Sequence, residues 1–425
     1  MLDIRYIREH RDECLERLAV RGDPALPDLI DRAIEADQAR RELISEVEEL
    51  KAERNARSRE IGERKREGAD ADDIVAEMQK VAARIRALDS ELTGVEEKLE
   101  SLLLLIPNLP DPRVPPGREG EGEVVHTWGD PPAPDGRFES HWTIGERLGL
   151  LDLERGAKLT GSGFPLFVGP GARLQRSLIQ LMLDTHVSQH GYTELAPPYL
   201  VNRDSMTATG HLPKFEVDAY RTDPDDLFLV PTAEVPVTNL YRGEILDGEM
   251  LPLAYVAYTP CFRREAGAAG KDTRGLLRVH QFDKVELVRF VEPARSEAEL
   301  EVLTGHAERV LELLELPYRR ILLPGGDLGF ANAMTYDLEA WAPGVEAWLE
   351  VSSCSNYGDY QARRANIRFR PGPAERPLYA HTLNGSGLAL ARIIVALLEI
   401  HQRPDGSVDL PAALRPYMGV DRLES

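Results

Sequence analysis

Apolar residues recur at alternating intervals of four and three along two long stretches near the start of the chain. The second stretch has nine such positions: Ile74, Met78, Val81, Ile85, Leu88, Leu92, Val95, Leu99 and Leu102. The first has a sparser seam that includes three arginines: Leu29, Ala33, Ala36, Arg40, Leu43, Val47, Leu50, Arg54, Arg57 and Ile61. This is the heptad pattern of helices that pack along one side, so the sequence predicts two long amphipathic helices.

The two seams are separated by a short break at residues 67–70 (EGAD). Gly68 suits the end of one helix, and Asp70 suits the N-cap of the next. The break predicts an antiparallel coiled-coil arm over about residues 28–104, with helices of roughly 30 residues or more and a reach of about 50 Å. Residues 1–27 are predicted to be helical and to pack at the base of the arm.

A Pro/Gly-rich stretch at residues 107–120 predicts a linker between an N-terminal domain, residues 1–106, and a larger domain, residues 121–425. In the larger domain the pattern changes to short apolar runs separated by turns. It predicts helices at 172–189, 296–315 and 386–402 and strands at 251–262, 276–292, 334–342 and 345–354. Since no strand–helix–strand unit repeats, a mixed α+β fold with a largely antiparallel sheet is favoured.

The composition narrows the class of protein. The 425 residues are 42% hydrophobic and 29% charged, which excludes long intrinsic disorder. Three scattered cysteines (Cys14, Cys261 and Cys354) do not make a disulfide framework. The N-terminus is charged where a signal peptide would be apolar, and no apolar run approaches about 18 residues. We therefore expect a cytoplasmic protein without a membrane segment.

One basic stretch stands out, because the chain as a whole has a net charge of −21. Residues 51–66 (KAERNARSREIGERKR) contain seven Lys or Arg against three Glu. Such a run can be the solvated face of a helix, or it can bind phosphates through its guanidinium and ammonium groups. Periodicity alone leaves both interpretations open.

Four polar clusters interrupt otherwise apolar segments of the larger domain: VPTAEVPVTN (230–239), CFRREAGAAGKDTRGLLRVHQFDKVELV (261–288), WLEVSSCSNYGDYQARRANIRF (348–369) and TLNGSGLALAR (382–392). Charges in buried strands are costly unless they are paired or functional, so these clusters indicate an active site. Two common motifs do not fit this sequence. GAAGK (267–271) lacks the flanking residues of a P-loop. The spacing of His186 and His190 is that of a zinc-protease helix, but its glutamate is missing, so we predict that both are packing or surface residues.

Together and in this order, the TAE, FRREAG, KVE, EVSSCSN and TLNGSG segments resemble the motifs of class II aminoacyl-tRNA synthetases as they occur in bacterial-type seryl-tRNA synthetases. The N-terminal LDIRYIREH and the ERNARSREIG stretch of the arm fit the same family. The resemblance implies an enzyme that uses ATP and Mg²⁺, without zinc, to activate L-serine as seryl-adenylate. It implies transfer of the serine to tRNA(Ser), and to tRNA(Sec) in a host that uses selenocysteine. It also implies a homodimer, with the helix at 172–189 in the dimer-forming motif.

The resemblance further implies residue roles. Arg263, at the α-phosphate and the serine carboxylate, and Arg392, at the γ-phosphate, are the expected catalytic residues. The expected serine-binding residues are Thr232, Ala233, Glu234, Arg263, Glu286, Asn384 and Ser386. The expected ATP-binding residues are Arg263, Arg264, Glu265, Val279, Phe282, Glu350, Val351, Ser352, Ser353 and Arg392, of which Glu350 and Ser353 would also bind Mg²⁺. The expected tRNA contacts on the arm are Arg54, Arg57, Lys65 and Arg66.

Two departures and two alternatives accompany the resemblance. The family commonly has serine at the position of Arg264 and glycine at that of Ala391, and neither change removes a group that the chemistry needs. One alternative is a ligase that loads a carrier protein, although relatives of that kind lack the long arm. The other is a noncatalytic RNA-binding paralogue, although such a protein would be expected to lose Arg263, Glu265 and Arg392.

Overall fold

The computed structural model describes residues 1–68, 70–133, 136–266 and 274–424. The chain divides into two compact units, residues 1–19 with 23–107 and residues 20–22 with 108–425. Among the helices described, none is long and apolar enough to cross a bilayer.

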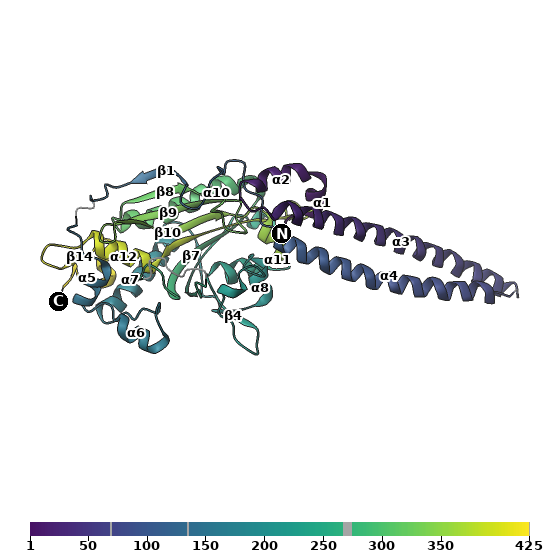
Figure 1. Cartoon of the computed structure of the whole chain (residues 1–425), viewed down its shortest axis with the longest axis horizontal. Helices are drawn as coiled ribbons and strands as arrows, with labels where there is room; N and C mark the ends of the chain where they lie inside the picture. Colours follow the sequence, from purple (N-terminus) through teal and green to yellow (C-terminus); the bar gives the residue numbers. More distant parts are fainter. Residues whose placement is uncertain (69, 134–135, 267–273, 425) are drawn as a thin grey trace. The chain divides into compact units, whose positions relative to one another are not determined.

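Two long antiparallel helices make up most of the first unit: α3 (Leu26–Arg66) and α4 (Asp72–Leu105). They lie side by side (Figure 1), and at 1.5 Å per residue the 41 residues of α3 span about 60 Å. Every position of the predicted α4 seam is buried or half-buried, and Leu88 at its middle is fully buried. The predicted coiled-coil arm is confirmed.

Two short helices, α1 (Ile4–Glu9) and α2 (Arg11–Ala19), pack against α3, as predicted for the start of the chain. Asp37 of α3 accepts hydrogen bonds from Arg8 at 2.6 Å and from Arg40 at 2.9 Å. Burial by itself would raise the pKa of Asp37, but these hydrogen bonds outweigh it and hold the pKa below its usual value. The base of the arm is therefore fixed partly by a buried charge cluster.

The turn between α3 and α4 differs from the prediction by one residue. Gly68 follows the C-cap Glu67 with a left-handed backbone (φ 73°), as expected of a glycine after a helix. The N-cap of α4 is Ala71 rather than Asp70. The Asp70 carboxylate accepts a hydrogen bond from the Asp72 N–H at 2.9 Å, so it still satisfies a free amide at the helix start.

An eight-stranded sheet organises the second unit, in the order β1-β8-β9-β10-β13-β7-β6-β2. Its strands are β1 (Glu123–Trp128), β2 (Thr193–Leu195), β6 (Leu253–Phe262), β7 (Gln281–Val291), β8 (Tyr318–Leu322), β9 (Met334–Ala342), β10 (Ala347–Asn356) and β13 (His381–Ala389). All neighbouring pairs are antiparallel except β2 with β6. The predicted fold class, α+β with a largely antiparallel sheet, is confirmed.

Three helices cover one face of this sheet: α7 (Pro170–Ser188), α10 (Ser296–Leu313) and α12 (Leu390–Ile400). Their apolar sides and Val285 and Leu287 of β7 belong to the main core. The even-numbered residues of β7 face the other way. Near the start of β7 these residues line a cavity. Near its end they belong to a second core, which includes residues of three short helices, α8 (Arg203–Ala208), α9 (Glu234–Thr238) and α11 (Tyr360–Ala365).

The remaining elements of the second unit are short, and residues 107–122 contain no helix or strand. These elements are helices α5 (His141–Arg147), α6 (Leu153–Thr160) and α13 (Arg415–Met418), the 3-10 helices η1 (Glu216–Asp218), η2 (Asn239–Tyr241), η3 (Gly248–Met250) and η4 (Pro293–Arg295), and strands β3 (Leu200–Asn202), β4 (Leu227–Leu229), β5 (Ile245–Asp247), β11 (Arg368–Arg370), β12 (Leu378–Tyr379), β14 (Val408–Asp409) and β15 (Arg422–Leu423).

Two predicted boundaries are wrong. Residues 386–389, predicted to begin a helix, end strand β13, because they pair with residues 284–286 of β7. The predicted strand at 276–292 begins only at Gln281, since residues 276–279 leave the sheet and line the cavity. At the first boundary the apolar run from Leu388 continues into α12, and periodicity cannot separate a buried strand from a buried helix. At the second, Leu276, Leu277 and Val279 are apolar like the strand that follows, although they belong to a loop. The other predicted helices and strands are present within a few residues.

We expect Gly385→Ala to destabilise the second unit by about 1–3 kcal/mol, because it overpacks the contact between β13 and α10. A Cβ at this position would lie 2.5 Å from Leu303 Cδ2 and 2.8 Å from Cys354 Sγ. Gly305→Ala is the matched control, since a Cβ there meets nothing within 4 Å and alanine favours the helix. Urea unfolding of both variants gives the comparison, and equal stabilities would contradict the tight packing.

Candidate active site

A cavity of about 420 Å³ lies on the sheet face opposite α7, α10 and α12. Strands β7, β13 and β10, which are neighbours in the sheet, supply one part of its wall. Further parts come from the first turn of α12, the segment that leads into α9, the segment between β6 and β7, and single residues of other loops. Each of the four polar clusters of the sequence contributes to the lining.

Most of the predicted site residues line this cavity: Thr232, Glu234, Arg263, Glu265, Val279, Phe282, Glu286, Glu350, Val351, Ser353, Asn384, Ser386 and Arg392. Three predicted residues are not among the lining residues. Ala233 is buried in the second core, and Arg264 lines a separate, open hollow. The hydroxyl of Ser352 donates to the backbone carbonyl of Ser386 at 2.7 Å. Residues 267–273, which include the GAAGK segment, lie outside the described residues.

Arg263 directly follows β6 and stands over an aromatic ring of β7. Its guanidinium carbon lies 5.2 Å from the centre of the Phe282 ring, a cation–π contact. Two residues on, Glu265 has a left-handed backbone (φ 51°), which is costly for a residue other than glycine. The Glu265 carboxylate is paired with Arg278 at 2.5 Å. An ion pair therefore supports the start of this loop.

A neighbouring segment supports the same loop through its backbone. Asp218, the last residue of η1, accepts the backbone N–H of Arg264 at 2.9 Å through its carbonyl. Its side chain accepts the backbone N–H of Ala266, also at 2.9 Å. The Arg264 guanidinium in turn donates to the carbonyl of Val217 at 3.1 Å. Arg264 therefore attaches the loop to η1 instead of entering the cavity.

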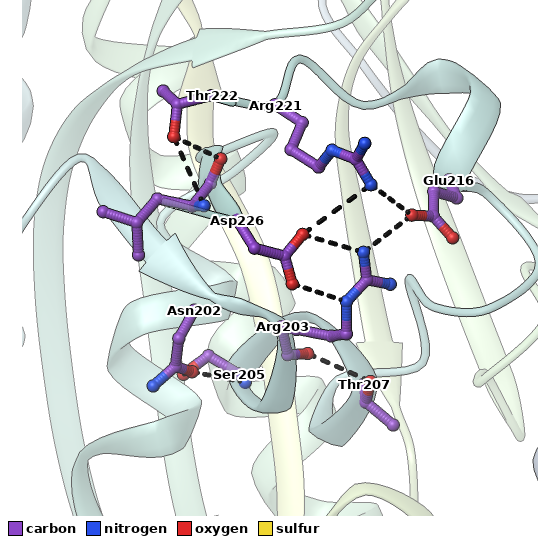
Figure 2. Close-up of polar contacts among 9 residues, drawn as sticks. Asn202, Arg203, Ser205, Thr207, Glu216, Arg221, Thr222 and Asp226 are labelled. Carbon is purple, nitrogen blue, oxygen red and sulfur yellow. Dashed lines mark hydrogen bonds and ion pairs between the residues drawn. The ribbon is translucent and has the colours of Figure 1, made fainter. Parts of the chain in front are cut away.

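An ion-pair network fixes η1 itself (Figure 2). Arg203 bonds Asp226 and Glu216, each at 2.8 Å, and Arg221 bonds Glu216 at 3.3 Å. Hydrogen bonds from Arg203 lower the pKa of both Asp226 and Glu216. Because Glu216 is the first residue of η1, the network joins α8, η1 and the turn before β4 into one support for the loop after β6.

Two buried carboxylates lie deeper in the cavity. Glu286 on β7 pairs with Lys284 and accepts a hydrogen bond from the Thr232 hydroxyl at 3.1 Å. Glu234, the first residue of α9, accepts from the Gln361 side-chain amide at 2.7 Å. Burial raises the pKa of both glutamates, and the charge of Lys284 opposes the shift.

A β-bulge in β10 brings Glu350 and Ser353 to the cavity together. Residues three apart on a regular strand point to opposite faces of a sheet. Here the pairing with β9 shifts between Glu350 and Ser352, so Val351 is an extra residue. Arg392, in the first turn of α12, donates to the backbone carbonyl of Glu350 at 2.7 Å. The bulge and this hydrogen bond place a carboxylate, a hydroxyl and a guanidinium side by side.

In strand β13, successive side chains point alternately to the cavity and to the helical layer. Asn384 and Ser386 line the cavity, and the glycines at 385 and 387 pack against the helical layer. The Tyr357 hydroxyl donates to Asn384 Oδ1 at 2.9 Å. This bond orients the Asn384 amide so that its nitrogen is the group left to donate.

The cavity also contains residues that the sequence analysis did not identify: His211, Leu276, Leu277, Arg278, Lys284, Asn332, Ser355, Tyr357, Ala389 and Ala391. Lys284 could have been found, because it lies two residues before Glu286 and shares its face of the strand. His211 and Asn332 carried no signal, since they come from loops outside the four clusters. Burial, with the nearby charges of Arg263 and Lys284, lowers the pKa of His211 to about 3, so this imidazole is neutral at pH 7.

Glu350 and Ser353 are the residues best suited to a divalent cation. Within the described ranges, no three His, Cys, Asp or Glu side chains gather closely enough to hold a metal ion by themselves. Mg²⁺, however, is commonly held by one or two carboxylates together with substrate phosphates and water. The Glu350 side chain is 48% exposed and shares the cavity with the Ser353 hydroxyl, so the pair fits this mode of binding.

The cavity as a whole combines fixed cations with fixed anions. The Arg263 and Arg392 guanidinium groups can bind phosphate and carboxylate oxygens, each through a planar fork. The buried Glu234 and Glu286 can accept from an ammonium or a hydroxyl group. Such a set suits the joining of an amino-acid carboxylate to a phosphate, a reaction that needs positioning and charge neutralisation more than acid–base groups.

Comparison with known proteins gives the class first. Residues 214–401, which contain most of the cavity lining, match the family model described as the tRNA synthetase class II core domain (G, H, P, S and T). The fold is therefore that of a class II aminoacyl-tRNA synthetase. Residues 1–110, with the arm, match the seryl-tRNA synthetase N-terminal domain.

Whole-chain relatives then give the family. The serine–tRNA ligase of Gemmatimonas aurantiaca is 54% identical over 420 residues, 99% of each chain, and that of a Geobacillus strain is 56% identical at the same coverage. The crystal structure of seryl-tRNA synthetase from Pyrococcus horikoshii complexed with ATP has a TM-score of 0.94 at 37% identity, covering 100% of this chain and 99% of that one. The chain belongs to the seryl-tRNA synthetase family, as its motifs predicted.

We expect Ser352→Ala to lower the free energy of unfolding by about 1–3 kcal/mol, because it leaves the buried Ser386 carbonyl without its donor. Ser188→Ala is a control: that hydroxyl also donates to a backbone carbonyl, but on an exposed helix end where water can replace it. Chemical unfolding of both variants measures the difference. Equal effects of the two substitutions would show that the buried hydrogen bond contributes no more than an exposed one.

Proposed function

We propose that this protein is a serine–tRNA ligase that forms seryl-adenylate from L-serine and ATP and transfers the serine to tRNA(Ser), and to tRNA(Sec) in a host that uses selenocysteine. The observation that carries the proposal is the grouping of Arg263 and Arg392 with Glu234 and Glu286 in one cavity. The arginines suit the anionic groups of both substrates. The glutamates suit the ammonium and hydroxyl groups of serine.

In the activation step, Arg263 binds the α-phosphate and the serine carboxylate and aligns them for attack. Its contact with Phe282 supports this role, because the ring fixes the guanidinium before substrates arrive. Arg392 binds the γ-phosphate. Glu265, held by Arg278, accepts from the adenine amino group, and Phe282 and Val279 line the adenosine pocket.

Glu350 and Ser353 hold Mg²⁺ in this proposal. The bound ion would neutralise phosphate charge as the bond to pyrophosphate breaks. Arg392 supports the arrangement, because it bonds the Glu350 backbone at 2.7 Å and lies 3.5 Å from the Glu350 carboxylate, beside the place assigned to the γ-phosphate.

Serine is selected at the deep end of the cavity. Glu234, in the TAE segment, receives the α-ammonium, and Glu286 with Ser386 and Asn384 surrounds the side-chain hydroxyl. Alanine or glycine would leave one oxygen of the buried Glu286 carboxylate without a donor, and a site built to bond a hydroxyl can reject such analogues by about 10⁴-fold. Threonine keeps the hydroxyl and must be excluded by lack of room, a weaker barrier of about 10–200-fold.

For the transfer step we assign tRNA binding to the arm of the N-terminal domain and catalysis to the C-terminal domain. RNA duplexes are read mainly through shape and backbone, which suits a long helical hairpin with basic side chains. We also propose a homodimer that uses α7, supported by the exposed apolar Val168 and Val187 before and on this helix. A cytoplasmic location is supported by three free, buried cysteines.

Amino-acid-dependent ATP–pyrophosphate exchange tests the proposal. We expect exchange with L-serine and little with alanine, glycine or threonine, followed by acylation of tRNA(Ser). Arg263→Lys should lower kcat/KM for serine by about 10²–10³-fold, because lysine cannot bind two oxyanions through a planar fork. Arg155→Lys, on the exposed helix α6, is the matched control. Exchange without acylation would favour the carrier-loading ligase, and no exchange would favour the noncatalytic paralogue.

The arm makes its own prediction, since its basic residues differ in their surroundings. Arg57 is paired with Glu60 at 3.0 Å, and Arg66 donates to the Gly62 carbonyl at 3.1 Å. Arg54 and Lys65 are exposed, and no ion-pair partner for either is found in the described part of the chain. Arg54 and Lys65 are therefore the more available to phosphates.

Arg54→Ala and Lys65→Ala should each weaken tRNA binding and reduce the slope of log K against log salt by about 0.7–1. Arg57→Ala should have a smaller effect, because its charge is already partly neutralised. Filter binding at several salt concentrations measures the slopes, with serine-dependent exchange as a control for the catalytic unit. Unchanged slopes for both single variants would remove this stretch from the tRNA interface.

A further inference from the structure

Lys284 is a cation that lines the cavity beside the buried Glu286, and it has no role in the proposed function. It is 6% exposed and lies on β7 two residues before Glu286, which is 2% exposed. Its ammonium pairs with the Glu286 carboxylate. A buried lysine is costly to desolvate, so its presence beside the serine-binding residues calls for a role.

The ion pair uses one of the two oxygens of the Glu286 carboxylate. Glu286 Oε2 is the oxygen that pairs with Lys284 Nζ, and the same oxygen accepts from the Thr232 hydroxyl at 3.1 Å. For the other oxygen, Oε1, no partner is found among the described residues. Glu286 lines the cavity, so Oε1 is the atom left to bond a ligand.

The charges around Glu286 make the lysine necessary. Glu234, 8% exposed, lies in the same cavity, and its charge raises the pKa of Glu286 after burial has already done so. Lys284 lowers the pKa of both carboxyl groups, and Arg263 adds to the effect at Glu234. His211 is neutral at pH 7 and Tyr357 keeps its proton, since burial raises the pKa of the phenol well above its usual value. Without Lys284, two carboxylates would share a desolvated space.

We propose that Lys284 is a positioning residue that determines specificity: it fixes the Glu286 carboxylate through Oε2, so that Oε1 accepts the side-chain hydroxyl of serine. This inference rests on the proposed function and deepens it. The ammonium of serine then neutralises Glu234 as Lys284 neutralises Glu286. A ligand without a hydroxyl leaves Oε1 unbonded, and this unpaired acceptor is the basis of rejection.

The role predicts a pH signature that a merely structural lysine would not give. In Lys284→Met, the KM for serine in ATP–pyrophosphate exchange should rise roughly 10- to 100-fold near pH 6.5, because each pH unit below a raised carboxyl pKa lowers the ionised fraction tenfold. The KM should fall again toward pH 8.5 as the carboxyl groups ionise. In the unaltered protein the KM should change by less than about threefold over this range.

Specificity provides a second readout. A protonated Glu286 no longer demands a hydroxyl donor, so the ratio of kcat/KM for serine over alanine should fall by about tenfold or more in Lys284→Met. The KM for ATP should stay near its original value, since among the described residues the ion pair found for Lys284 is with Glu286 and not with a group assigned to the nucleotide.

Three further variants complete the test. Lys284→Gln keeps a hydrogen-bond donor without the charge and should reproduce the pH-dependent KM, which also covers the case in which the methionine variant does not fold. Lys284→Arg keeps the charge and should restore a flat profile. Lys158→Met removes an exposed lysine of α6 and should change neither readout. Thermal unfolding establishes that each variant is folded.

The outcomes separate the two proposals. If the unaltered protein shows no serine-dependent exchange, the proposed function fails and the role of Lys284 fails with it. If exchange is present but folded Lys284→Met or Lys284→Gln keeps a flat KM profile and an unchanged serine-to-alanine ratio, only the role of Lys284 is overturned.

Discussion

The pairing of β13 between β10 and β7 is the constraint on which the catalytic unit depends. One face of β13 must pack against the helical layer, and its other face must line a polar cavity. Gly385 meets the first demand, because any side chain there would collide with Leu303 of α10. Asn384 and Ser386 meet the second. Because side chains alternate between the two faces from Asn384 to Ser386, a one-residue shift of register there would exchange the places of glycine and polar residues.

The electrostatics of the cavity follow from the same burial. Removing Glu234 and Glu286 from water raises the pKa of both carboxyl groups, and the site offsets this with Lys284, Arg263 and hydrogen bonds from Thr232 and Gln361. The charges are therefore fixed before a ligand arrives. Preorganised charges of this kind stabilise a reaction in which two anions meet, because little reorganisation remains to be done during the chemical step.

The arm shows why net charge is a poor guide to partners. The chain carries a net charge of −21, yet residues 51–66 have an excess of basic residues on an exposed part of α3. Nucleic acids bind local patches, whereas net charge governs solubility and long-range steering. The ion pair between Arg57 and Glu60 further divides the patch into neutralised and available cations.

Much of this molecule could be read from its sequence. The two heptad seams and the short break between them determined the arm, because a heptad period is typical of packed helices and the break allows a hairpin. The polar clusters around Arg263, Glu286, Ser353 and Arg392 identified most of the cavity lining. Tertiary structure alone decided the rest. The bulge at Val351 brings Glu350 and Ser353 to one face, which their spacing would forbid on a regular strand. The run at 386–389 becomes strand because β7 pairs with it. His211 and Asn332 reach the cavity from distant loops. Strand register, bulges and the positions of loops depend on contacts between segments far apart in the chain. The pattern of apolar residues within one segment therefore does not predict them.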